Sequence, residues 1–178
     1  MFLDRFFRPK PATVAGRALY DAAAAQARHP VFYTDFGTPD TLEGRFELYT
    51  LHVVLLLDRL HQAGPGAAEV RQAVFDAYVR GLDDALREIG VADTSVGKKM
   101  KKLAGAFYGR LRAFEGAFAA LPDDAELRAL IGRTTFGDAE DGRAPRLAAY
   151  TVAARAALAA QEAESLIDGG APVWPVSP

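Results

Sequence analysis

The chain has 178 residues, of which 50% are hydrophobic and 25% are charged, with a formal net charge of −2 and no cysteine. This length is enough to bury a core within one domain. The lack of cysteine excludes disulfides, thiolate metal sites and a cysteine nucleophile, and it agrees with a reducing compartment. No apolar run approaches the roughly 20 residues of a membrane span and no cleavable signal is evident, so we expect a cytoplasmic protein.

Residues 1–10 (MFLDRFFRPK) combine aromatic and basic side chains. On a short helix they would form a basic amphipathic segment able to make peripheral contact with an anionic membrane, at the cytoplasmic face of the inner membrane. The alternative is that the phenylalanines pack on the domain. The candidate membrane-contact residues are Phe2, Arg5, Phe6, Phe7 and Arg8.

Pro11 is expected to begin a first helix that ends near Ala27. This helix is rich in alanine and has few large apolar residues, so we place it at the edge of the domain. Residues 29–38 are expected to form a loop whose aromatic side chains pack onto the core.

Asp40 is followed three residues later by Glu43, a capping-box pattern that predicts the start of a second helix, which runs to Gln62. Residues 48–57 are apolar almost all round, which is typical of a buried central helix. His52 lies in this segment, and it shares a stripe with basic residues seven positions before and after it. Such neighbours disfavour the charged form of a histidine. Two interpretations of His52 remain open: it belongs to a polar contact line, or it is an interior histidine whose hydrogen bonds are satisfied.

A turn at residues 64–66 leads to a third helix that stops at Gly90. Two acid–base pairs at i,i+4, Asp76–Arg80 and Asp83–Arg87, predict a solvated outer face. The inner face is predicted to consist of Phe75, Tyr78, Val79, Leu82, Leu86 and Ile89.

Residues 93–118 carry the most distinctive pattern in the chain. Large apolar residues from Val96 to Phe118 are spaced by three or four, which predicts a long helix with a narrow buried stripe and a cap at Thr94 or Ser95. Glycine within a helix costs about 1 kcal/mol relative to alanine, so several glycines on the opposite face favour close approach by another chain. The alternative is a neighbouring helix of the same domain, with the lysines merely solvated. This glycine–lysine face comprises Lys98, Lys101, Lys102, Gly105, Gly109, Arg112 and Gly116.

After a break at Pro122, a second capping pattern at Asp123 predicts a short helix. Residues 136–144 form an acidic loop that lacks the ligand spacing of a calcium loop. A last helix is predicted from Pro145 to Asp168. The fold is therefore expected to be all-α: a single compact bundle of about six helices over residues 11–168 with a buried central helix.

The tail, residues 169–178, is rich in proline and glycine and is expected to be extended or disordered. Trp174 within it would dock on a groove, either here or on a partner.

The sequence offers little support for catalysis. Its three histidines share no metal-ligand spacing, and the Val-Gly-Lys-Lys run at 96–99 lacks the rest of a phosphate loop. Asp83 and Asp84 are adjacent on a helix and point about 100° apart, so they form no carboxylate pair. We expect a non-enzymatic protein without cofactor or metal. The slightly negative charge argues against DNA as a partner.

Two groups of residues resemble motifs of the ubiquinol-cytochrome c chaperone family, over about residues 31–150. The first group consists of Pro39-Asp40-Thr41, Gly44-Arg45-Phe46 and Leu51-His52. The second and more specific group consists of Leu86-Arg87-Glu88, Gly90-Val91, Asp93, Val96-Gly97-Lys98-x-Met100-Lys101 and Phe107-Tyr108-Gly109-Arg110.

The resemblance implies an assembly factor for the cytochrome bc1 complex, ubiquinol-cytochrome c reductase (complex III of the respiratory chain). Mitochondrial members bind newly made cytochrome b together with a small co-chaperone, near the ribosomal exit tunnel. We expect the compact bacterial form, without the long N-terminal extension, and nascent cytochrome b as its client. A ribosome and a co-chaperone are the further candidate partners that the resemblance suggests.

Two other functions remain open. A helical module could bind lipid or a small molecule in a pocket lined by Phe46, Tyr49 and Phe107. Alternatively, the basic run from Lys98 to Arg112 could dock RNA or a ribosome, which would make binding strongly salt-dependent.

Overall fold

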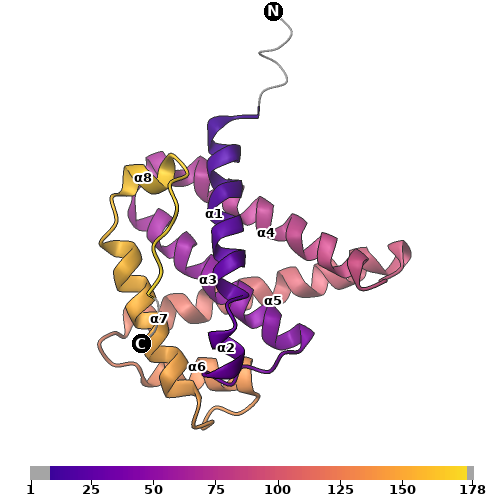
Figure 1. Cartoon of the computed structure of the whole chain (residues 1–178), viewed down its shortest axis with the longest axis vertical. Helices are drawn as coiled ribbons and strands as arrows, with labels where there is room; N and C mark the ends of the chain where they lie inside the picture. Colours follow the sequence, from indigo (N-terminus) through magenta and orange to yellow (C-terminus); the bar gives the residue numbers. More distant parts are fainter. Residues whose placement is uncertain (1–8, 176–178) are drawn as a thin grey trace, which may run out of the picture.

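The computed structural model describes residues 9–175, and within this range it contains eight α-helices and no strand (Figure 1). The all-α prediction is confirmed. The elements are α1 (Pro11–Ala27), α2 (Val31–Thr34), α3 (Leu42–Gln62), a 3-10 turn η1 (Pro65–Ala67), α4 (Ala68–Glu88), α5 (Asp93–Ala119), α6 (Ala125–Ile131), a π-helical turn η2 (Gly132–Phe136), α7 (Ala144–Ala159) and α8 (Ala163–Ile167).

Helix α3 is the buried centre of the bundle, as its apolar sequence predicts. It packs against α1, α4, α5 and α7, and residues 50–57 are all buried. Its cap differs from the prediction by one residue. The Thr41 hydroxyl accepts a hydrogen bond from the Gly44 N–H at 3.1 Å, whereas Asp40 pairs with Arg45. Thr41 takes this role because its extended backbone directs the hydroxyl into the first turn.

Helix α1 has the bounds predicted, but its placement at the domain edge is wrong. It crosses α3 and α4 and buries one whole face (Figure 1). A Cβ added to Gly16 would lie 2.4 Å from the Cβ of Ala73 on α4. The small residues of α1 thus allow the backbones of α1 and α4 to approach closely. This close packing buries surface on both helices, although α1 has few large apolar side chains.

Helices α4 and α5 form a long antiparallel hairpin that projects from the rest of the bundle (Figure 1). Gly90 ends α4 as predicted: it has φ +82°, and the Val91 N–H donates to the Leu86 carbonyl at 3.0 Å. Ile89, predicted to face inward, is 56% exposed because it lies at the tip of the hairpin. The predicted cap of α5 is also wrong, since this helix begins at Asp93 without a side-chain cap.

The predicted ion pairs on α4 are half correct. Arg87 donates to Asp83 at 2.7 Å, as expected. Asp76 instead accepts a hydrogen bond from Gln72, and no ion pair joins Asp76 to Arg80 within residues 9–175.

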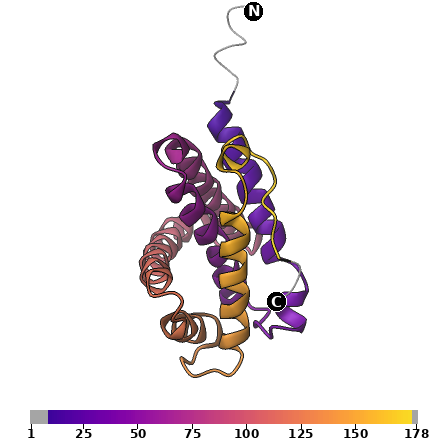
Figure 2. The same ribbon diagram turned by 90° about the vertical axis from the view of Figure 1, so that its left-hand side faces the viewer.

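The single C-terminal helix predicted from Pro145 to Asp168 is two helices, α7 and α8. Arg59 of α3 donates to the Leu158 and Gln161 carbonyls at 2.9 and 2.7 Å, which satisfies the end of α7 and lets the chain turn. Helix α8 then packs on α1. The following coil returns along the bundle (Figure 2). Within this coil, Trp174 packs on the core.

No helix in the described part of the chain is both long enough and apolar enough to cross a bilayer. The candidate membrane-contact residues Phe2, Arg5, Phe6, Phe7 and Arg8 lie outside the described residues.

Candidate functional site: the outer face of helix α5

Helix α5 separates an apolar stripe from the glycine–lysine face as the spacing predicts. Val96, Phe107, Phe114 and Phe118 are buried. They anchor the helix against α3, α4 and α6. The opposite side of the helix is left facing solvent, and its lysines and glycines are exposed.

The glycines of this face have no partner within the described chain. A Cβ added at Gly105, Gly109 or Gly116 would meet no atom within 4 Å. Gly16 and Gly81 are different, because a Cβ there would collide with Ala73 and Tyr20 respectively. Packing of a neighbouring helix within residues 9–175 therefore does not explain the glycines of α5.

The positive charges on this face are equally free. Lys98, Lys101, Lys102 and Arg112 are exposed, and none of them takes part in an ion pair among the residues that the structure describes. These side chains create a positive surface beside the row of glycines, where no side chain projects from the helix. That arrangement can accept an acidic or apolar segment of another molecule close to the helix backbone.

Arg110 belongs to the same basic run but has a structural role. Its Nε and Nη2 donate to the two carboxylate oxygens of Glu47 on α3 at 2.9 and 2.8 Å. The Glu47 side chain is 8% exposed and that of Arg110 is 28% exposed. The hydrogen bonds to Glu47 raise the pKa of Arg110. This bidentate pair ties α5 to the central helix.

His52 is an interior histidine with both ring nitrogens satisfied. Nδ1 donates to the Leu48 carbonyl at 2.8 Å, and Nε2 accepts from the Tyr150 hydroxyl at 2.9 Å. Gln26 in turn donates to the Tyr150 oxygen. Burial lowers the pKa of His52 to about 4. The prediction that flanking arginines disfavour its charged form assigned the wrong cause.

The ring of Trp174 covers His52, with ring centroids 5.2 Å apart in a T-shaped arrangement. Gln161 holds the segment in place, because its side-chain amide bonds both the N–H and the carbonyl of Val173. The tail thus docks on its own domain through residue 174, one of the two options that its sequence left open.

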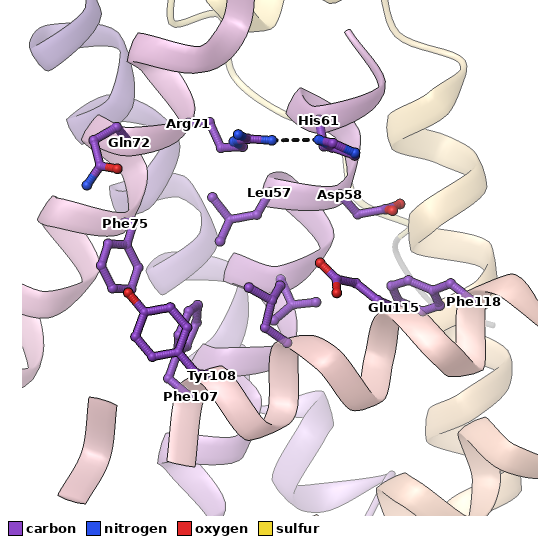
Figure 3. Close-up of a pocket in the computed structure, with 12 residues that line it drawn as sticks. Leu57, Asp58, His61, Arg71, Gln72, Phe75, Phe107, Tyr108, Glu115 and Phe118 are labelled. Atoms are coloured by element: carbon purple, nitrogen blue, oxygen red, sulfur yellow. Dashed lines mark hydrogen bonds between the residues drawn. The ribbon is translucent and has the colours of Figure 1, made fainter. Parts of the chain in front are cut away.

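The described residues contain no group of three or more His, Cys, Asp and Glu side chains that could hold a metal. A groove of about 450 Å³ lies between α3, α4 and α5 (Figure 3). Phe107 lines it as predicted, but Phe46 and Tyr49 do not. Those two side chains are partly buried against other parts of the core.

Comparison with known proteins agrees with the motifs. The model of the family described as ubiquinol-cytochrome C chaperone matches residues 34–174. The chain belongs to this family. The crystal structure of the Cbp3 homolog from Brucella abortus superposes with a TM-score of 0.80 at 36% identity, covering 95% of this chain and 94% of that chain. No curated protein gives a match. As a family member, the chain is an assembly chaperone of the bc1 complex.

The motif residues of this chaperone divide between surface and interior. Asp40 and Arg45 form an exposed ion pair at the start of α3. On α5, Gly97, Lys98, Tyr108 and Gly109 are exposed, and Tyr108 retains 51% of its surface. His52 and Arg110 point inward instead, where they hold helices together.

Sequence reasoning missed Glu47, Tyr150 and Gln26, the partners of these two inward residues. A signal for Glu47 exists, because an acidic residue directly before the apolar run of α3 requires a cation nearby. No comparable pattern indicates which tyrosine meets His52, since the two residues are 98 positions apart.

Proposed function

We propose that this chaperone binds newly made cytochrome b along the glycine–lysine face of α5 and thereby promotes assembly of the bc1 complex. Family membership supports the client, and the open glycines support the surface. Transmembrane helices associate through close backbone contact and van der Waals packing. The glycines of α5 would allow a helix of the client to approach equally closely, because no side chain projects there. The observation that carries the proposal is that Gly105, Gly109 and Gly116 face no other part of residues 9–175.

The basic residues beside the glycines would support client binding electrostatically. Lys98, Lys102 and Arg112 stand exposed and unpaired within the described residues, so they can meet an acidic client segment or the anionic lipid beside it. Peripheral membrane contact by residues 1–10 would keep the chaperone close to the insertion site. A ribosome or a small co-chaperone remains a further candidate partner, and the protein is proposed to act without catalysis.

The proposal is tested by reversing the charge of Lys98, Lys102 and Arg112 to Glu together. We expect the triple variant to fold normally and to lose cytochrome b capture in cells. A matched control changes Arg17, Arg80 and Arg133 to Glu, three exposed basic residues elsewhere that alter the net charge equally. Capture of cytochrome b by the first variant at the wild-type level would refute the proposal.

A photo-crosslinking residue at position 105 tests the same surface without changing its charge. The expected product contains cytochrome b, and the amount of assembled bc1 complex in the same cells is read from its haem absorbance. Position 14, an exposed site on α1, is the control for collision with abundant proteins. RNA as the main crosslinked species would instead favour the ribosome-docking alternative.

A further inference from the structure

The groove between α3, α4 and α5 is a second surface, distinct from the glycine–lysine face. Its floor is apolar, made by the buried side chains of Leu57, Phe107 and Phe118. Phe75 of α4 and Tyr108 of α5 form one wall, with ring centroids 5.7 Å apart. Tyr108 stays half exposed above this floor (Figure 3). The groove thus offers apolar area to a molecule that lies between the two helices of the hairpin.

Two opposite charges lie on either side of this floor, and no oppositely charged side chain of residues 9–175 pairs with either of them. On one side, Arg71 of α4 donates from Nη1 to Nδ1 of His61 at 2.6 Å. The partner in this hydrogen bond is an imidazole nitrogen and not a carboxylate, so the bond gives the positive charge of Arg71 no counter-ion. On the other side lies Glu115 of α5 (Figure 3). Within residues 9–175, Arg71 has no carboxylate partner and Glu115 has no hydrogen bond or ion pair.

We infer that this groove binds one amphipathic helix of a partner protein. The apolar stripe of the partner helix would cover the floor of the groove. An acidic residue of that helix would face Arg71, and a basic residue would face Glu115. A helix fits because apolar anchors at i, i+3, i+4 and i+7 form a stripe of this kind, and because its backbone groups are bonded internally. An extended peptide would find no sheet edge here within the described residues.

Charge complementarity favours a helix over a lipid. The single anionic head of a fatty acid or phospholipid would pair with Arg71, but it would leave Glu115 beside hydrocarbon and desolvated without a cation. A helix with both an acid and a base satisfies both residues at once. Asp58, which also borders the groove, is already occupied by Arg155 at 2.8 Å and needs no partner.

The experiment uses the full chain and two fluorescein-labelled peptides. Each peptide is an alanine-rich helix with leucines at i, i+3, i+4 and i+7; the first carries Glu before the stripe and Lys after it, and the second carries them in reverse order. Fluorescence anisotropy gives the affinities. We expect one of these peptides to bind about tenfold tighter than a version with glutamine at both charged positions.

The variants Arg71→Glu and Glu115→Lys test which charges act. Each should weaken the preferred peptide about tenfold, and reversing the facing charge of the peptide should restore binding. Arg80→Glu, on the exposed side of α4, should change nothing. Circular dichroism checks folding, and Arg71→Gln and Glu115→Gln replace any variant that unfolds.

Equal binding of charged and neutral peptides would overturn the inference, as would affinities that do not respond to Arg71 and Glu115. Tight binding of a fluorescent fatty acid that depends on Arg71 alone would overturn it in favour of a lipid groove. The glycine–lysine face is tested separately by crosslinking at position 105, so either surface can fail without the other.

Discussion

Mild acid should destabilise this chaperone mainly through His52. The pKa of His52 is about 4 in the folded protein, compared with an ordinary value of 6.5 in the unfolded chain. Above pH 6.5 both states are neutral, and the stabilising contribution of the buried imidazole is fully present. Between pH 6.5 and 4 only the unfolded chain takes up the proton, so the free energy of unfolding decreases as the pH falls.

The size of the loss follows from these two values. The difference of about 2.5 pH units, at about 1.4 kcal/mol for each, sets a ceiling of about 3.5 kcal/mol, of which about 2 kcal/mol is lost by pH 5. Urea denaturation at pH 7.5, 6.5 and 5 measures this directly. With a slope of about 2 kcal/mol per molar urea, the midpoint should fall by about 1 M between the extremes. Trp174 is the single tryptophan and packs on His52, so its fluorescence reports the transition.

One variant separates His52 from other titrating groups. His52→Gln should be less stable at pH 7.5 but should lose most of the dependence on pH above 5. If the wild type and His52→Gln lose stability equally between pH 7.5 and 5, the buried imidazole does not control the acid response.

Three further perturbations test the packing. Arg110→Ala should lower the free energy of unfolding by about 2 kcal/mol, which is less than the about 3–5 kcal/mol typical of fully buried pairs because Arg110 is partly exposed. Thermal denaturation should show little additional loss when Glu47→Ala is added. Gly16→Ala should destabilise the fold by about 1–3 kcal/mol through collision with α4, whereas Gly105→Ala should stabilise it by about 0.5–1 kcal/mol; equal effects would contradict the packing described. Gln161→Ala should release the tail and red-shift tryptophan emission, and an unchanged spectrum would show that the indole holds the tail alone.

The sequence predicts the features of this fold that depend on hydrophobic spacing and on the glycine that ends α4, although the caps of α3 and α5 differ from the prediction. The three-and-four spacing from Val96 to Phe118 determines which side of α5 is buried, because a helix of that length has one face available to the core. Gly90 ends α4 because its φ of +82° is open to glycine and strained for other residues. The outward position of the glycine–lysine face follows from the same periodicity.

Features that depend on partners far along the chain could not be predicted. Helix α1 appeared peripheral because alanines carry little hydrophobic area, yet its small side chains allow contact with Ala73 of α4. The break between α7 and α8 depends on Arg59, which lies about 100 residues earlier. The α3–α5 groove has the same origin, since Arg71 and Glu115 come together only after three helices pack.

The free glycines of α5 are difficult to explain by stability alone. Each costs about 0.5–1 kcal/mol relative to alanine, so Gly105, Gly109 and Gly116 together lower helix stability by about 1.5–3 kcal/mol. No close contact within the described residues requires glycine at these positions, because a Cβ at any of them would meet open space. A loss of this size is a substantial part of the 5–15 kcal/mol that keeps a domain folded. We therefore propose that these glycines serve contact with another molecule, as the proposed client requires. If alanine at all three positions raised stability while bc1 assembly continued unchanged, that explanation would be wrong.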